Sequence, residues 1–104
     1  MKEITPTELQ TLLAGDDPPV VLDVREAWEV GICAIDGALH IPLRSLPQRM
    51  TDIPAERVIA VVCHHGMRSA MAAGFLLESG IEAVNVAGGM DRWAREIDGA
   101  MARY

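Results

Sequence analysis

One stretch of the sequence, "VVCHHGMRSA" at residues 61–70, gathers residue types that can do chemistry. Cys63 closes an apolar run, and a short loop leads from it to an alanine-rich segment that starts near Ser69. A curled loop that feeds a helix N-terminus can direct several backbone N–H groups at one centre, where they stabilise an anion. The spacing therefore supports a nucleophilic thiolate at Cys63, with Arg68 adding positive charge nearby.

The spacing alone leaves two alternatives open for Cys63. A strand-cysteine-loop-helix arrangement supports nucleophilic chemistry but does not require it, and most lone cysteines are small, inert core residues. The two cysteines of the chain do not make a disulfide framework, so both are expected to be free thiols in a reducing compartment. Cys33, in the apolar surroundings "GICAI", is expected to pack rather than to resolve a disulfide.

The adjacent histidines after the cysteine raise the question of a metal site. Zinc normally takes three or four protein ligands, adjacent loop side chains diverge, and His40 is the only other histidine. No metal site is therefore expected. Gly66 allows a tight curl of the loop, so His64, His65 and Met67 are expected to point outwards as a rim that contacts a substrate or only solvent.

The elements that must position this loop alternate between strand and helix. Apolar runs predict five strands, at residues 2–4, 20–24, 38–41, 57–62 and 83–86. Between them, helices are predicted after a capping box at Thr5–Glu8, at 26–30, after a second capping box at Ser45–Gln48, at 69–79 and at 90–97. Strands covered on both faces and joined by helices indicate an α/β domain with a largely parallel sheet. In such sheets the reactive site lies beyond the carboxyl ends of the strands, where Cys63 falls.

Length and charge exclude several classes of protein. The 104 residues suffice for one packed core, so residues 1–104 are expected to form a single domain. The net charge of −6 argues against nucleic acid or an anionic membrane as the main partner. No apolar stretch approaches the length of a membrane span, and the N-terminus has no apolar export signal, so a cytoplasmic location is expected.

The cysteine loop resembles the active-site pattern of the rhodanese-like domain family, in which Arg-Ser follows the cysteine after a short glycine-containing loop. Further segments resemble family elements in the same order along the chain: "LDVRE" at 22–26 with Glu29, "GA" at 37–38, "IP" at 41–42, and "GG" at 88–89 with Trp93. The resemblance implies a three-layer α/β/α fold with a five-stranded, mainly parallel central sheet, and a Cys63 that takes sulfane sulfur as a persulfide.

The resemblance also implies a type of reaction. Phosphatases and arsenate reductases of this fold carry five residues between cysteine and arginine, whereas His64, His65, Gly66 and Met67 make four here, which fits sulfur transfer. The implied activity is that of a sulfurtransferase without a cofactor, with a donor such as thiosulfate and with cyanide, a thiol or a protein as acceptor. The alternative is a persulfide carrier or protein-interaction module that turns over little free thiosulfate.

Several residues are expected to support the loop. Arg68 is either a direct contact for an anionic substrate or an anchor paired with a carboxylate such as Asp23 or Glu29; the anchor is favoured because a tightly curved loop needs fixing and arginine can bond bidentately. The remaining supporting residues are expected to be Asp23, Arg25, Ser69 and Trp93, with Trp93 in the core or the pocket wall. His40 is expected to bond locally.

Overall fold

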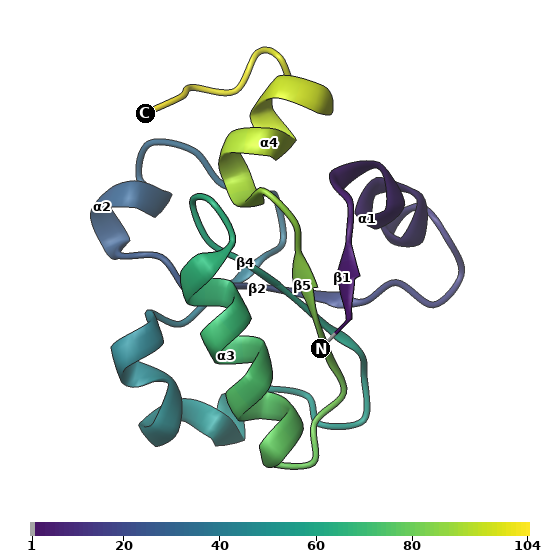
Figure 1. Ribbon diagram of the computed structural model, residues 1–104, viewed down its shortest axis with the longest axis vertical. Helices are drawn as coiled ribbons and strands as arrows, with labels where there is room; N and C mark the ends of the chain where they lie inside the picture. The colour runs from purple at the N-terminus through teal and green to yellow at the C-terminus, as the bar shows by residue number, and fades with distance from the viewer. Residues whose placement is uncertain (1) are drawn as a thin grey trace.

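The computed structural model describes residues 2–104, which form a five-stranded parallel sheet with helices on both faces (Figure 1). The strands are β1 (Glu3–Ile4), β2 (Val20–Asp23), β3 (Leu39–His40), β4 (Ile59–Val62) and β5 (Ala83–Val86). Their order in the sheet is β1-β5-β4-β2-β3, and every neighbouring pair is parallel. The predicted three-layer α/β/α architecture is confirmed.

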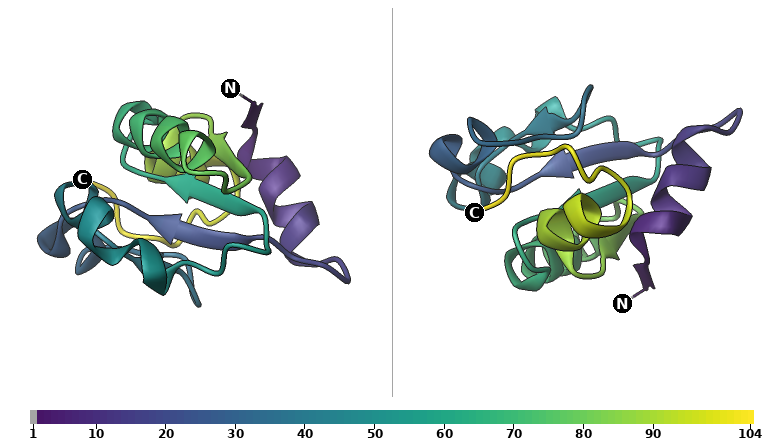
Figure 2. Two further views of the ribbon diagram at one scale, coloured as in Figure 1. Left: turned by 90° about the horizontal axis from the view of Figure 1, so that it is seen from below. Right: turned by 90° about the horizontal axis from the view of Figure 1, so that it is seen from above.

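The two faces of the sheet carry separate apolar cores. Helices α1 (Pro6–Leu13) and α4 (Gly89–Glu96) cover one face, while the 3-10 segment η1 (Leu43–Asp52) and α3 (Met67–Glu78) cover the other (Figure 2). Side chains of a strand point alternately to the two faces. Along β4, Ala60 and Val62 pack on the α1/α4 side, and Ile59, Val61 and the following Cys63 pack on the α3 side. The sulfur therefore lies on the α3 face.

One predicted capping box is confirmed and the other is wrong. Thr5 and Glu8 each bond the other's backbone N–H at the start of α1. Ser45 does not open a helix with Gln48, because η1 begins at Leu43 without a side-chain cap. Pro47 lies inside this segment and cannot donate a backbone hydrogen bond, which favours a kinked 3-10 segment over a regular helix.

Helix α3 starts two residues earlier than the sequence indicates. With this start, the residues of α3 that are fully buried are Ser69, Ala72, Ala73 and Leu76. The shift places Ser69 against the sheet, behind the cysteine loop. Within residues 2–104, no helix is both long enough and apolar enough to cross a membrane.

Candidate active site

The loop after β4 curls back onto its own cysteine. Cys63 is buried directly beyond β4, and α3 begins four residues later at Met67. Gly66, which caps α3, has a φ of +109°, a conformation that L side chains rarely adopt. In this conformation the Gly66 N–H donates to Cys63 Sγ at 3.0 Å. An amide donor at this distance favours a negatively charged sulfur.

The first turn of α4 holds the backbone of the same loop. The N–H groups of Met90 and Asp91 donate to the carbonyl oxygens of Cys63 and His64, at 2.8 and 3.0 Å. Gly89 lies so close to this backbone that an added Cβ would collide with both carbonyl oxygens. The close approach of the glycine pair at 88–89 therefore lets the free donors of a helix N-terminus bind the loop.

Arg68 is tied to the first helical turn after β2. Its two terminal nitrogens donate to the two carboxylate oxygens of Glu29 at 2.6 and 2.8 Å, on helix α2 (Ala27–Val30). Glu29 is 4% exposed, and the bonds from Arg68 lower its pKa to about 2 despite burial. The same bonds raise the pKa of Arg68, although burial opposes them. The ion pair thus fixes the start of α3 against α2.

A second, fully buried ion pair holds the segment that carries Glu29. Arg25 donates to the Asp23 carboxylate at 2.7 Å, and its other guanidinium bonds reach the carbonyl oxygens of Glu29 and Cys33. Burial lowers the pKa of Arg25, but the bonds to Asp23 and to the Tyr104 hydroxyl outweigh it and raise the pKa. Asp23 and Arg25 therefore support the cysteine loop indirectly, by positioning the carboxylate that Arg68 binds.

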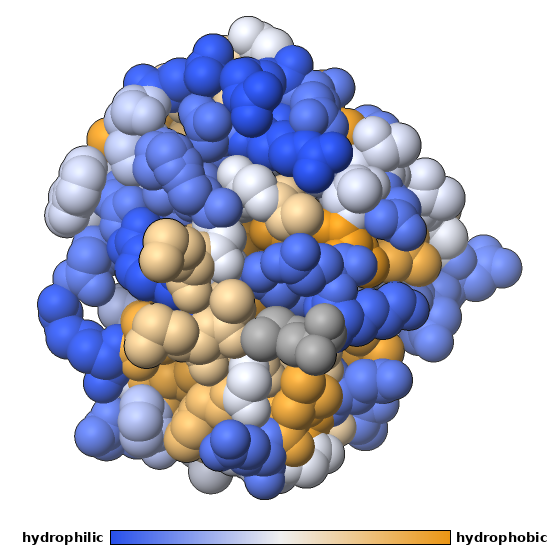
Figure 3. All heavy atoms as spheres, in the orientation of Figure 1, coloured by the Kyte–Doolittle hydropathy of each residue, from blue (hydrophilic) through white to orange (hydrophobic). Residues whose placement is uncertain are grey.

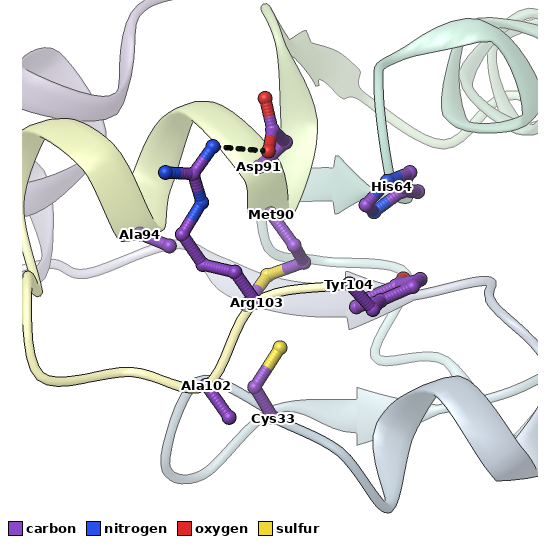
Figure 4. A pocket seen from close by; sticks show the side chains of 8 residues that line it. All are labelled: Cys33, His64, Met90, Asp91, Ala94, Ala102, Arg103 and Tyr104. Carbon is purple, nitrogen blue, oxygen red and sulfur yellow. Dashed lines mark hydrogen bonds and ion pairs between the residues drawn. The ribbon is translucent and has the colours of Figure 1, made fainter.

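Tyr104 joins both ion pairs and covers part of the loop. Its hydroxyl donates to Glu29 Oε2 at 2.8 Å and accepts from Arg25 Nη1 at 3.0 Å. Burial raises the pKa of this hydroxyl to about 12. The centroid of its ring lies 4.0 Å from that of His64. Figure 4 shows both side chains and, nearby, the Arg103–Asp91 ion pair. No local sequence pattern predicts a role for Tyr104, because its hydroxyl bonds a residue 75 positions earlier in the chain.

Behind the sulfur, a chain of hydrogen bonds runs from Cys63 to the edge strand. The Ser69 hydroxyl lies 3.2 Å from Cys63 Sγ and 2.5 Å from Asn85 Oδ1. The Asn85 amide nitrogen donates to Glu3 Oε2 at 2.8 Å and to the Gly66 carbonyl oxygen at 3.1 Å. Asn85 was not among the predicted site residues, although a polar residue within the apolar strand "AVNV" indicates a specific role.

Cys63 lines an open pocket of about 320 Å³ together with His64, His65, Met67 and Arg68. His65 and Met67 are exposed, as expected for a rim. His64 also lines the pocket but is half-buried, because Tyr104 stacks on it; burial and the neighbouring His65 lower the pKa of its ring.

The remaining expected residues lie away from this pocket. Trp93 belongs to the core on the α1/α4 face and does not line the pocket at Cys63. His40 bonds the Arg25 carbonyl oxygen at 2.7 Å. Within residues 2–104, no three His, Cys, Asp or Glu side chains are grouped so that they could hold a metal ion.

Comparison with known proteins agrees with this fold and shows the family. Residues 5–96 match the model of the rhodanese-like domain, and the chain belongs to this family. It is 34% identical over 96 residues to YtwF of Bacillus subtilis, covering 92% of this chain and 93% of that protein. It is 33% identical to a protein of Allochromatium vinosum named sulfurtransferase, covering 91% and 90%. The structure of a rhodanese-like domain protein from Staphylococcus aureus superposes with a TM-score of 0.86 at 36% identity, covering 89% and 91%.

Proposed function

We propose that the protein is a sulfurtransferase that carries sulfane sulfur as a persulfide on Cys63. The observation that carries this proposal is the bond of 3.0 Å from the Gly66 N–H to Cys63 Sγ, in a four-residue loop at an open pocket. A backbone donor aimed at the sulfur stabilises the negative charge that the thiolate needs for attack. The reaction needs a free thiol at Cys63, which the cytoplasm maintains.

The reaction proceeds in two displacements at sulfur. The Cys63 thiolate attacks the outer sulfur of a donor such as thiosulfate; the new S–S bond forms while the old one breaks, and sulfite leaves with the electron pair. A nucleophilic acceptor then attacks the outer sulfur of the persulfide, and the Cys63 thiolate is the leaving group. Cyanide gives thiocyanate in this step, and a thiolate gives a new persulfide. Neither step requires a cofactor.

Arg68 acts in this scheme as the anchor of the loop. Both of its terminal nitrogens are bonded to Glu29, which supports a role in fixing the shape of the loop more than in binding an anionic donor. Asp23, Arg25 and Tyr104 position Glu29, while His65 and Met67 at the rim meet the donor and the acceptor.

A second candidate function is a persulfide carrier for a protein acceptor. Beside the pocket, α3 exposes Met67 by 80% and Met71 by 68%, one helical turn apart. Figure 3 shows hydrophobic side chains gathered over this side of the molecule. Exposed methionines adapt to varied protein surfaces, which favours a protein acceptor. Steady-state turnover with thiosulfate and cyanide separates an enzyme from a carrier, which would load sulfur once and turn over slowly.

The intact mass of the protein after incubation with thiosulfate tests the persulfide. We expect the mass of one added sulfur atom, which cyanide removes. The Cys33→Ser variant should retain the adduct and Cys63→Ser should lose it. A wild-type protein without the adduct, or an adduct that persists in Cys63→Ser, would contradict the proposal.

A further inference from the structure

The hydrogen bonds of Asn85 fix which way its amide points. Its nitrogen faces two oxygen acceptors, the Glu3 carboxylate and the Gly66 carbonyl. Turning the amide over would bring its oxygen against both of them, where no hydrogen bond could form. The oxygen of Asn85 must therefore face the Ser69 hydroxyl, which lies 2.5 Å from it.

This orientation determines where the Ser69 proton lies. A serine hydroxyl has one proton, and the bond to the Asn85 oxygen uses it. Ser69 then presents only lone pairs to Cys63 Sγ at 3.2 Å. It can accept a hydrogen bond from a Cys63 thiol, but it cannot donate one to a thiolate or a persulfide without giving up Asn85. Gly66 N–H and Ser69 thus act in opposite directions on the sulfur.

We propose that Asn85 is a positioning residue that turns the Ser69 hydroxyl away from Cys63 and so holds the idle cysteine in its thiol form. The proposal depends on the proposed function only in taking Cys63 as the reacting thiol. When the sulfur ionises, the Ser69 hydroxyl rotates from Asn85 to Sγ. The reactivity of the free protein is therefore set by competition between an amide oxygen and a sulfur for one proton.

The charged and titratable groups around Cys63 act on the same equilibrium, and the test must hold them constant. His64 and His65 lie on the loop, Arg68 on α3, Glu29 on α2 and Tyr104 on the C-terminal segment. Glu3, on β1, is linked to the site through Asn85. Asn85→Val keeps all of these side chains but removes the bond from Asn85 to Glu3, so the same substitution must also be compared in a Ser69→Ala background. Valine favours the strand conformation, and the Gly66 carbonyl keeps its helical bond from the Ala70 N–H.

The first test compares the rate of Cys63 alkylation by iodoacetamide across pH, with all variants in a Cys33→Ser background. With Asn85→Val, Ser69 is free to donate to the sulfur, so the rate near pH 6 should rise about tenfold, the gain expected from one added hydrogen bond to a charged group. If Asn85 only supports the loop, the substitution should leave the dependence of the alkylation rate on pH unchanged or make Cys63 less reactive. Either result would overturn the proposal.

The matched control is Ser69→Ala with and without Asn85→Val. Without the hydroxyl, the Asn85 substitution should leave the profile unchanged, and a rise that persists there would also overturn the proposal. Because these experiments use iodoacetamide, their outcome is independent of whether thiosulfate loads the protein. A failure of the proposed function would appear in the mass measurement instead.

A second measurement requires no change at Asn85, in case that variant does not fold. The Raman S–H stretching band of the Cys33→Ser protein reports whether the Cys63 thiol donates a hydrogen bond. We expect a band lowered in frequency by donation to Ser69, and its return towards the free-thiol position in the added Ser69→Ala variant. A band that does not move between the two proteins would overturn the proposal.

Discussion

Arg68 and Glu29 lie 39 residues apart in the sequence and join through two parallel hydrogen bonds. The pair connects the helix that follows Cys63 to the turn that follows β2. Its carboxylate is almost completely buried, whereas a third of the arginine side chain is exposed. The geometry of the cysteine loop therefore depends on an ion pair that forms without a bound substrate.

Replacing Arg68 by Lys should separate the anchor from a direct contact with the donor. Lysine keeps the charge but loses the bidentate fork, so we expect a loss of about 1–3 kcal/mol in the free energy of unfolding together with a lower kcat. Thermal unfolding and thiosulfate kinetics on this variant measure both. A raised KM with unchanged stability would indicate a direct contact instead.

The pKa of Glu29 predicts how stability depends on pH. It lies at about 2 in the fold, against 4.5 for an unperturbed glutamate side chain. A lowered folded-state pKa contributes stability that is complete above the unfolded value and is lost as pH falls towards the folded value. This contribution is about 3 kcal/mol, lost between about pH 5 and pH 2. Urea unfolding at several pH values should show a shallower acid decline for Glu29→Gln. Parallel declines would contradict the assignment.

Two substitutions at Tyr104 should separate its hydroxyl from its ring. Tyr104→Phe loses the bonds to Glu29 and Arg25 but keeps the stack on His64, and we expect a loss of about 1–2 kcal/mol in stability. Tyr104→Leu also removes the stack, which should free the His64 ring and raise its pKa towards the ordinary value. Histidine NMR titration together with thermal unfolding measures both effects. Equal His64 titration in the two variants would exclude a role for the ring.

The length of the cysteine loop should control persulfide formation. Inserting one glycine between His65 and Gly66 moves the Gly66 amide away from Sγ, and the rate of persulfide formation should fall about tenfold or more with the loss of this donor. The wider loop should bind phosphate or arsenate better, as protection of Cys63 from alkylation would show. A glycine inserted between Asp16 and Asp17, in the exposed turn after α1 and away from the site, is the matched control. Unchanged sulfur transfer in the loop variant would show that length does not decide the chemistry.

The sequence predicted what depends on local patterns. Apolar runs located all five strands, and the cysteine, glycine and arginine spacing located the loop. For Arg68, the sequence left both Asp23 and Glu29 as possible partners. The fold makes the choice, because Arg25 occupies Asp23 from two residues away and leaves Glu29 to Arg68.

What the sequence did not predict depends on distant pairing. Asn85 meets Ser69 only because β5 lies beside β4 and α3 starts at Met67. Tyr104 reaches Glu29 only because the C-terminal segment after α4 turns back towards α2. Such contacts are set by strand order and helix phase, and a short window of sequence contains neither.

The two ion pairs behind the loop also bear on how a donor reaches the pocket. Asp23 with Arg25 and Glu29 with Arg68 each sum to zero charge, so together they exert little long-range attraction on an anion. The protein as a whole carries a net charge of −6 and repels a dianion such as thiosulfate. Dissolved salt screens this repulsion over a Debye length of about 10 Å at 0.1 M. We therefore expect kcat/KM for thiosulfate to rise with ionic strength, and a decrease would mean that a net positive field guides the donor. A sulfane-sulfur donor without net charge meets no such barrier and should react at a rate that does not depend on salt concentration.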